Sequence, residues 1–205
     1  MVTIDPLDTV LVLMDLQNDV VDPDGIFAVP AEDQARVDQA LSVCARLLAW
    51  ARAESVPVAH VAVTYRPGHP EVGDDIPLLA AVKANKALVE GSWGAEFHPS
   101  VAPAPGEWTV RKRGISAFAG SDLELLLRQS RRHSLLLAGV ATQLVVLGTA
   151  LAAADLGLRP LLVPDACAAA PQEVHTAALD ITRAFAHLVP AEAILAPSSA
   201  DAAGV

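Results

Sequence analysis

Short apolar runs rich in branched residues alternate along the chain with longer segments whose apolar residues recur every three or four positions. The runs predict strands, and the longer segments predict helices. Strands are expected at 10–16, 56–65, 107–112, 134–140 and 159–166, with a last one near 193–196. Helices are expected at 31–54, 121–131, 143–157 and 171–186, with a short one near 76–88. The segment 66–106 is otherwise irregular.

Two helix ends carry local signals. Ser121 followed by Glu124 predicts a capping box at the start of the helix over 121–131. Gly157 is a usual stop signal and ends the helix over 143–157. These signals support the alternation of strand and helix.

The strands are apolar throughout, and most are followed by a helix. This pattern favours a parallel sheet covered on both faces, which is a doubly wound three-layer α/β/α sandwich. A barrel is the less favoured alternative, because six strands are too few for an eight-stranded barrel. We expect one domain over residues 1–196 and a flexible tail over 197–205.

Composition narrows the class of protein. The chain has 205 residues, of which 53% are hydrophobic, enough for a sizeable core. No uninterrupted apolar run has the length of a membrane span, and the first residues lack a basic region before an apolar one, so we expect a cytoplasmic protein. The net charge of −10 argues against a nucleic-acid partner.

Polar residues follow several predicted strands. Open parallel sheets bind ligands beyond the carboxyl ends of their strands. The residues at these ends are Asp15, Tyr65, Arg66, Lys112, the segment 139–142 and Asp165. A buried carboxylate is costly unless it is paired, so Asp15 alone is equally compatible with a structural cap. Asp15 together with Lys112 predicts a buried pair whose protonation can serve chemistry.

Three segments in order resemble the isochorismatase-like (cysteine hydrolase) superfamily. They are 10-VLVLMDLQNDVVDPDG-25, 107-EWTVRKRGISAFAGSDLELLLR-128 and 135-LLLAGVATQLVVLGTALAAADLGLRPLLVPDACAA-169. The resemblance implies a six-stranded parallel sheet and a triad of Asp, Lys and Cys. Asp15 and Lys112 match the first two members, whereas the nucleophile position falls on Val145. Valine offers no nucleophile, which argues against amide hydrolysis through a thioester.

The resemblance also implies an alternative chemistry, because isochorismatases work without the cysteine. They cleave an enol ether after an Asp protonates it, and here Asp15 would be that acid. Gln17 is then expected to hold substrate or water, and Lys112 or Arg66 to meet a carboxylate of a small anionic substrate. The peptide bond between Val140 and Ala141 is one that is often cis in this family.

Further site residues follow from position. Thr142 lies in the turn after the fourth strand, and Tyr65, Trp93 and Phe118 are candidates for the pocket wall, although ordinary packing explains each of them as well. No cofactor and no metal are expected. The nicotinamidase branch carries an Asp and paired His residues after the second strand, whereas this chain has the single His69 there.

Two other hypotheses stay open. The chain could be a catalytically inactive family member that serves as a binding or assembly scaffold. Alternatively, it could be an amide or C–N hydrolase with a different nucleophile, such as Cys167. Cys44 and Cys167 are otherwise expected to be buried thiols. The resemblance implies a homodimer or homotetramer acting on a small molecule.

Overall fold

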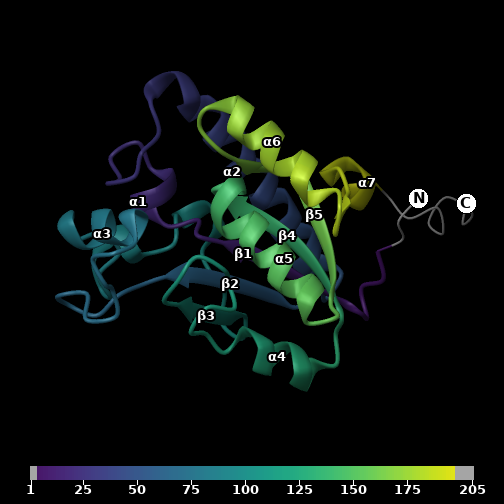
Figure 1. The fold of residues 1–205 in the computed structure, drawn as a ribbon. Coiled ribbons are helices and arrows are strands. Elements are labelled where there is room, and N and C mark those ends of the chain that lie inside the picture. The colour runs from purple at the N-terminus through teal and green to yellow at the C-terminus, as the bar shows by residue number, and fades with distance from the viewer. Residues whose placement is uncertain (1–3, 197–205) are drawn as a thin grey trace, which may run out of the picture.

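Six strands form one parallel sheet in the order β3-β2-β1-β4-β5-β6 (Figure 1). The computed structural model describes residues 4–196. The strands are β1 (Thr9–Met14), β2 (Val58–Val63), β3 (Trp108–Lys112), β4 (Ser134–Val140), β5 (Arg159–Ala168) and β6 (His187–Leu188). All neighbouring strands pair in parallel, so the fold class predicted from the sequence is confirmed.

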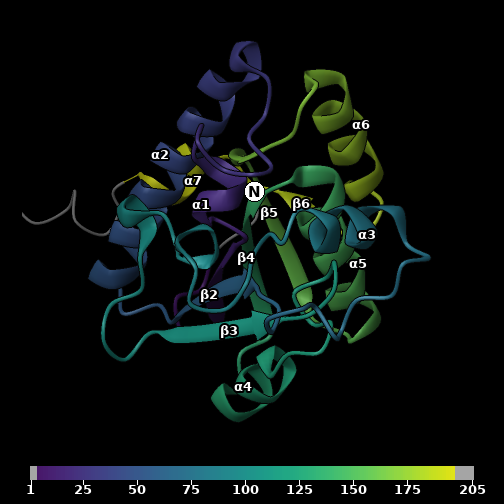
Figure 2. The same cartoon turned by 90° about the vertical axis from the view of Figure 1, so that its left-hand side faces the viewer.

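Helices cover both faces of this sheet (Figure 2). The helices are α1 (Asn18–Val21), α2 (Ala31–Ala53), α3 (Pro77–Ala84), α4 (Leu123–Ser130), α5 (Leu147–Asp155), α6 (Gln172–Thr182) and α7 (Ala191–Leu195). One apolar core joins α2 and α7 to the sheet, and a second joins α4, α5 and α6 to its other face. Helices α1 and α3 lie at one end of the sheet (Figure 1).

The central strands explain why the sequence shows continuous apolar runs instead of alternation. Every residue of β1, β2 and β4 is buried, because successive side chains point to opposite faces and both faces are covered. These strands therefore position whatever follows them at the carboxyl edge of the sheet.

The order of the strands reverses between β1 and β4: β2 and β3 are added on one side of β1, and β4, β5 and β6 on the other. Strands β1 and β4 are therefore neighbours in the sheet but far apart in sequence. At this point Gly139 pairs with Met14 and has a φ of +143°. A Cβ at position 139 would lie 2.2 Å from the Met14 carbonyl oxygen, so only glycine allows this close approach. Such a switch point is the usual ligand site of an open α/β sheet.

Two local predictions were wrong. Residues 193–196 belong to helix α7 and its end, and the edge strand is the two-residue β6. The capping box does not form, because Glu124 pairs with Arg128 instead. Ser121 Oγ accepts from the Leu123 N–H at 3.3 Å and donates to a backbone carbonyl.

Within residues 4–196, no helix is both long enough and apolar enough to cross a membrane. The tail predicted over 197–205 lies outside the described residues.

Candidate active site

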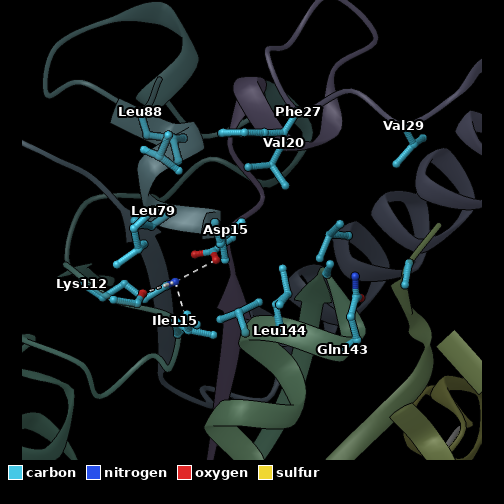
Figure 3. A pocket seen from close by; sticks show the side chains of 18 of the residues that line it. Asp15, Val20, Phe27, Val29, Leu79, Leu88, Lys112, Ile115, Gln143 and Leu144 are labelled. Atoms are coloured by element: carbon cyan, nitrogen blue, oxygen red, sulfur yellow. Dashed lines mark hydrogen bonds and ion pairs between the residues drawn. The ribbon is translucent and has the colours of Figure 1, made fainter. Parts of the chain in front are cut away.

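Asp15 and Lys112 meet at the carboxyl end of the sheet (Figure 3). Asp15 follows β1 directly with a φ of +54°, and Lys112 is the last residue of β3. Strand β2 lies between them, so the gap is two strand spacings of about 4.8 Å each. The long lysine side chain spans it and places Nζ 2.9 Å from Asp15 Oδ2. Both residues are buried.

The Lys112 ammonium has three acceptors. Besides Asp15 Oδ2, it donates to the carbonyl oxygens of Gly114 and Ile115, both at 2.9 Å. An ammonium carries three N–H bonds, so the protein satisfies all of its donors. The cation is therefore fixed in place and has no donor left for another group.

The two carboxylate oxygens of Asp15 differ. Oδ2 faces Lys112, whereas Oδ1 is buried and has no hydrogen-bond partner within residues 4–196. Burial raises the pKa of Asp15, and the charge and hydrogen bond of Lys112 oppose that rise. When Asp15 is protonated, the proton belongs on Oδ1, because Oδ2 already accepts from the ammonium.

A cavity of about 240 Å³ adjoins the pair. Of the described residues that line it, four have polar side chains: Asp15, Tyr65, Lys112 and Gln143. The remaining walls are aliphatic or aromatic side chains and short stretches of backbone. No cysteine, serine or threonine is among the described residues that line it.

The apolar roof of the cavity comes from segments far apart in sequence. Val20 and Phe27 lie on one side, and Leu79 and Leu88 on the other (Figure 3). The Asp19 carboxylate ties these segments together: it accepts from the Leu88 N–H at 2.9 Å and from the Ile26 N–H at 3.4 Å. It also fills the space that a side chain at Gly94 would need.

The floor follows β4. Residues Thr142–Val146 form a π-helical turn before α5, and such turns are frequent at functional sites. Val145 and Gln143 line the cavity from this turn. The Gln143 Oε1 is buried, and no group in the described part of the chain hydrogen-bonds to it. Gln143 lies on the opposite side of the cavity from Lys112 (Figure 3).

Several residues that the sequence placed in the site do line the cavity. Besides Asp15 and Lys112, they are Tyr65, Val140, Ala141 and Val145. The bond between Val140 and Ala141 is cis, as the resemblance implied. Burial, with the nearby charges of Asp15 and Glu71, raises the pKa of Tyr65 to about 12, so its phenol is neutral.

Two polar candidates lie outside the cavity lining. Gln17 is buried, and its amide bridges the backbones of Val63 and Ala95 through three hydrogen bonds. Its role in the structure is to join β2 to the segment around residue 95. Arg66 is exposed and pairs with Glu71 at 2.6 Å.

The other candidates outside the lining are Trp93, Phe118, Thr142 and Asp165. Trp93 is half exposed, and Phe118 packs against the core beside α4 and α5. Thr142 Oγ1 lies 2.8 Å from His175 Nδ1. The Asp165 carboxylate accepts from the Ala191 N–H and so caps α7.

Histidine and cysteine do not add to the cavity. His69 is buried, with Nε2 2.8 Å from the Ala87 carbonyl oxygen. Among residues 4–196, no group of three or more His, Cys, Asp or Glu residues could hold a metal. Cys44 and Cys167 are both buried, as predicted, and burial raises the pKa of Cys167 to about 12.

Sequence reasoning missed the apolar wall and Gln143. An apolar side chain that lines a cavity has the same sequence signature as one that packs in a core, so no pattern distinguishes Leu79 or Phe27. Gln143 lies inside the turn that the sequence marked, and an amide within an apolar run was the available signal.

The comparisons with known proteins agree with this geometry. The model of the isochorismatase domain matches residues 9–193. The chain belongs to the isochorismatase family. It is 32% identical over 186 residues to the phenazine biosynthesis protein PhzD of Pseudomonas fluorescens, covering 86% of this chain and 79% of that protein. It is 26% identical to the ureidoacrylate amidohydrolase RutB of Methylobacterium radiotolerans, over 87% of this chain and 74% of that protein.

Solved structures lead to the same family. An isochorismatase family protein from Desulfovibrio vulgaris superposes with a TM-score of 0.81 and 30% sequence identity, covering 91% of this chain and 96% of the other. The chain is therefore an isochorismatase-family hydrolase, and the comparisons leave its reaction and substrate open.

Proposed function

We propose that this isochorismatase-family protein is a hydrolase in which Asp15 is the general acid and base and water is the nucleophile. The observation that carries the proposal is the unpaired Asp15 Oδ1, which is buried at a cavity while Lys112 holds Oδ2. A carboxyl group whose pKa is raised by burial can deliver a proton near neutral pH.

The chemistry that needs only these groups is cleavage of an enol ether. Asp15 Oδ1–H gives its proton to the terminal carbon of the double bond, which forms a C–H bond and leaves an oxocarbenium ion. Water adds to the cationic carbon, and its proton passes to the Asp15 carboxylate. The hemiketal or hemiacetal then breaks the C–O bond to the original ether oxygen. Its hydroxyl group gives up a proton and becomes the carbonyl, and the departing oxygen takes up a proton and leaves as an alcohol. Asp15 ends protonated, as it began.

Lys112 holds Asp15 in this scheme and does not touch the reacting bond. Its three hydrogen bonds fix the ammonium, and the ion pair fixes the orientation of the carboxylate. Val145 stands at the nucleophile position that the family resemblance implies, and it presents only methyl groups to the cavity. Both features support acid–base chemistry over covalent catalysis.

Cys167 is poorly suited to replace the nucleophile. It is outside the cavity lining, and burial raises its pKa to about 12, so very little thiolate exists at neutral pH. Iodoacetamide applied to the native enzyme is expected to leave both cysteines unlabelled and activity unchanged. Inactivation that runs in step with labelling of Cys167 would restore the thiol hypothesis.

The test of the proposed function is turnover of isochorismate and simple vinyl ethers, measured as carbonyl release, beside a panel of amides measured as ammonia release. Turnover that Asp15→Asn abolishes supports acid–base catalysis by Asp15. Turnover that survives in Asp15→Asn refutes it. Absence of turnover across both panels would favour the inactive scaffold.

We also propose a cytoplasmic homodimer or homotetramer, as the resemblance implies. Leu151 on α5 and Ile181 on α6 are about half exposed, which supplies apolar surface for a second copy. Sedimentation that shows only a 21.3 kDa species would contradict the oligomer.

A further inference from the structure

We infer that the substrate of this cavity is a small uncharged molecule with an aliphatic or other apolar body, not the anionic metabolite that the sequence suggested. The inference rests on the proposed function only in taking this cavity as the reaction site. It concerns the charge and size of the molecule bound there.

No free cation faces the cavity from residues 4–196. Lys112 is the one basic residue in the lining that these residues form, and all three of its N–H bonds are used by Asp15, Gly114 and Ile115. A substrate carboxylate would need Lys112 to abandon one of these acceptors. Arg66, which follows β2 at the same edge of the sheet, binds Glu71 at the surface.

The cavity already holds a carboxylate, that of Asp15. Among residues 4–196, nothing hydrogen-bonds to Asp15 Oδ1. While Asp15 is ionised, its charge repels an anion bound beside it, and while Asp15 is protonated, the anion still bears the cost of leaving water. The whole chain carries a net charge of −10, which adds a repulsive long-range field. Neither effect opposes an uncharged molecule.

The roof of the cavity is apolar. Val20, Phe27, Leu79 and Leu88 present hydrocarbon to the interior (Figure 3). Such a surface binds an apolar group by removing it from water and gives nothing to a charged one. At about 30 Å³ for each water-sized group, a cavity of about 240 Å³ holds about eight non-hydrogen atoms.

Gln143 adds one polar contact away from Asp15. Its buried Oε1 lacks a partner and can accept from an N–H or O–H of the bound molecule. The expected ligand therefore has a reactive group at Asp15, an apolar body under the roof, and one neutral hydrogen-bond donor that reaches Gln143.

Two matched pairs of probes test the inference. The first pair is butyl vinyl ether and vinyloxyacetate. The second pair is hexanamide and succinamate. The two members of each pair have the same number of non-hydrogen atoms and differ in charge. For each pair, kcat/KM and the rise in melting temperature at equal concentration are measured with the whole protein.

The neutral member of whichever pair is turned over is expected to have a kcat/KM at least about 100-fold higher. Only the neutral probes are expected to raise the melting temperature. An equal or higher kcat/KM for the charged member, or a larger melting shift with it, would overturn the inference. So would the absence of any melting shift with either neutral probe.

A charge placed in the roof sharpens the test. Leu79→Arg supplies the missing cation and is expected to reverse the preference toward the carboxylate probes. Leu125→Arg is the matched control, because Leu125 is exposed on α4 and outside the cavity lining. If the folded Leu79→Arg protein keeps the wild-type preference for the neutral probes, the roof does not select the charge of the substrate. If that variant fails to fold, the paired probes on the wild type still decide.

The proposed function and this inference fail separately. Asp15-dependent turnover of the charged probes alone would keep the acid–base mechanism and remove the uncharged substrate. If the neutral probes bind and their turnover is unchanged in Asp15→Asn, the uncharged substrate is kept and the acid–base mechanism is removed.

Discussion

A carboxylate that is at least half buried lies at each end of strand β3, and the two differ in how many of their oxygens accept hydrogen bonds. At the amino end, Glu107 precedes the strand and accepts four hydrogen bonds, from Arg52, His60 and the Ala104 N–H. At the carboxyl end, Asp15 accepts from Lys112 through one oxygen only.

The pKa values move in opposite directions. The hydrogen bonds from Arg52, the Ala104 N–H and His60 together outweigh burial and hold the pKa of Glu107 at about 2. Burial outweighs Lys112 and raises the pKa of Asp15. Burial of an ion pair therefore does not by itself mark a reactive site. A free carboxylate oxygen beside a cavity distinguishes the end that can exchange a proton with a ligand.

Removal of the reactive carboxylate should give the largest effect. Asp15→Asn is expected to lower kcat/KM by about 10³-fold or more, because the general acid is lost. It also leaves Lys112 buried without a counter-charge, which is expected to cost about 3–5 kcal/mol of unfolding free energy. Kinetics and urea denaturation measure the two effects.

A double variant separates these effects. Asp15→Asn combined with Lys112→Met removes both charges and is expected to recover much of the stability without any activity. Recovery of activity in the double variant would mean that Asp15 is structural.

The single variant Lys112→Met tests the protonation of Asp15 through the pH dependence of kcat. Burial raises the pKa of Asp15 and Lys112 is the main influence that lowers it, so removal of Lys112 lets that pKa rise. An enzyme that needs protonated Asp15 loses activity as pH rises through this pKa. The pH–rate profile of the variant is therefore expected to extend to higher pH, with kcat at least about tenfold lower because the carboxylate is no longer held. A profile that moves to lower pH would contradict the assignment.

Glu107→Gln tests the other end of β3. It is expected to cost about 1–3 kcal/mol at pH 7 and to leave kcat unchanged. The pKa of Glu107 is lowered, so its stabilisation is present above pH 4.5 and is lost as pH falls toward 2. Denaturation of both proteins across this range should show their difference shrinking. A constant difference would mean that the charge of Glu107 does not stabilise the fold.

The smallest expected effect concerns Asp165. Asp165→Ala removes the acceptor for the first N–H of α7 and is expected to cost about 1 kcal/mol without changing activity. Asp165→Asn keeps an acceptor and serves as the control. A loss of activity in Asp165→Ala would return this residue to the site from which the structure separates it.

Sequence patterns predicted the sheet and the meeting of Asp15 with Lys112, because both depend on residues at the ends of long apolar runs. They failed for the short edge elements. The run at 193–196 has too few residues for periodicity to separate strand from helix, and β6 has only two. They also failed for Gln17, since nothing local indicates that an amide will bridge two distant backbones.

The Asp19 tether bears on how such an enzyme can change its substrate. Its carboxylate fixes Ile26 and Leu88, whereas α3 lies between the anchors and contributes side chains to the roof. Leu78 on α3 is already more than a third exposed. Mutations along α3 can therefore change the shape of the roof while Asp19 and Asp15 keep their positions. Substitutions in α3 can therefore change which substrate binds, in evolution or in the laboratory, without removing the catalytic acid.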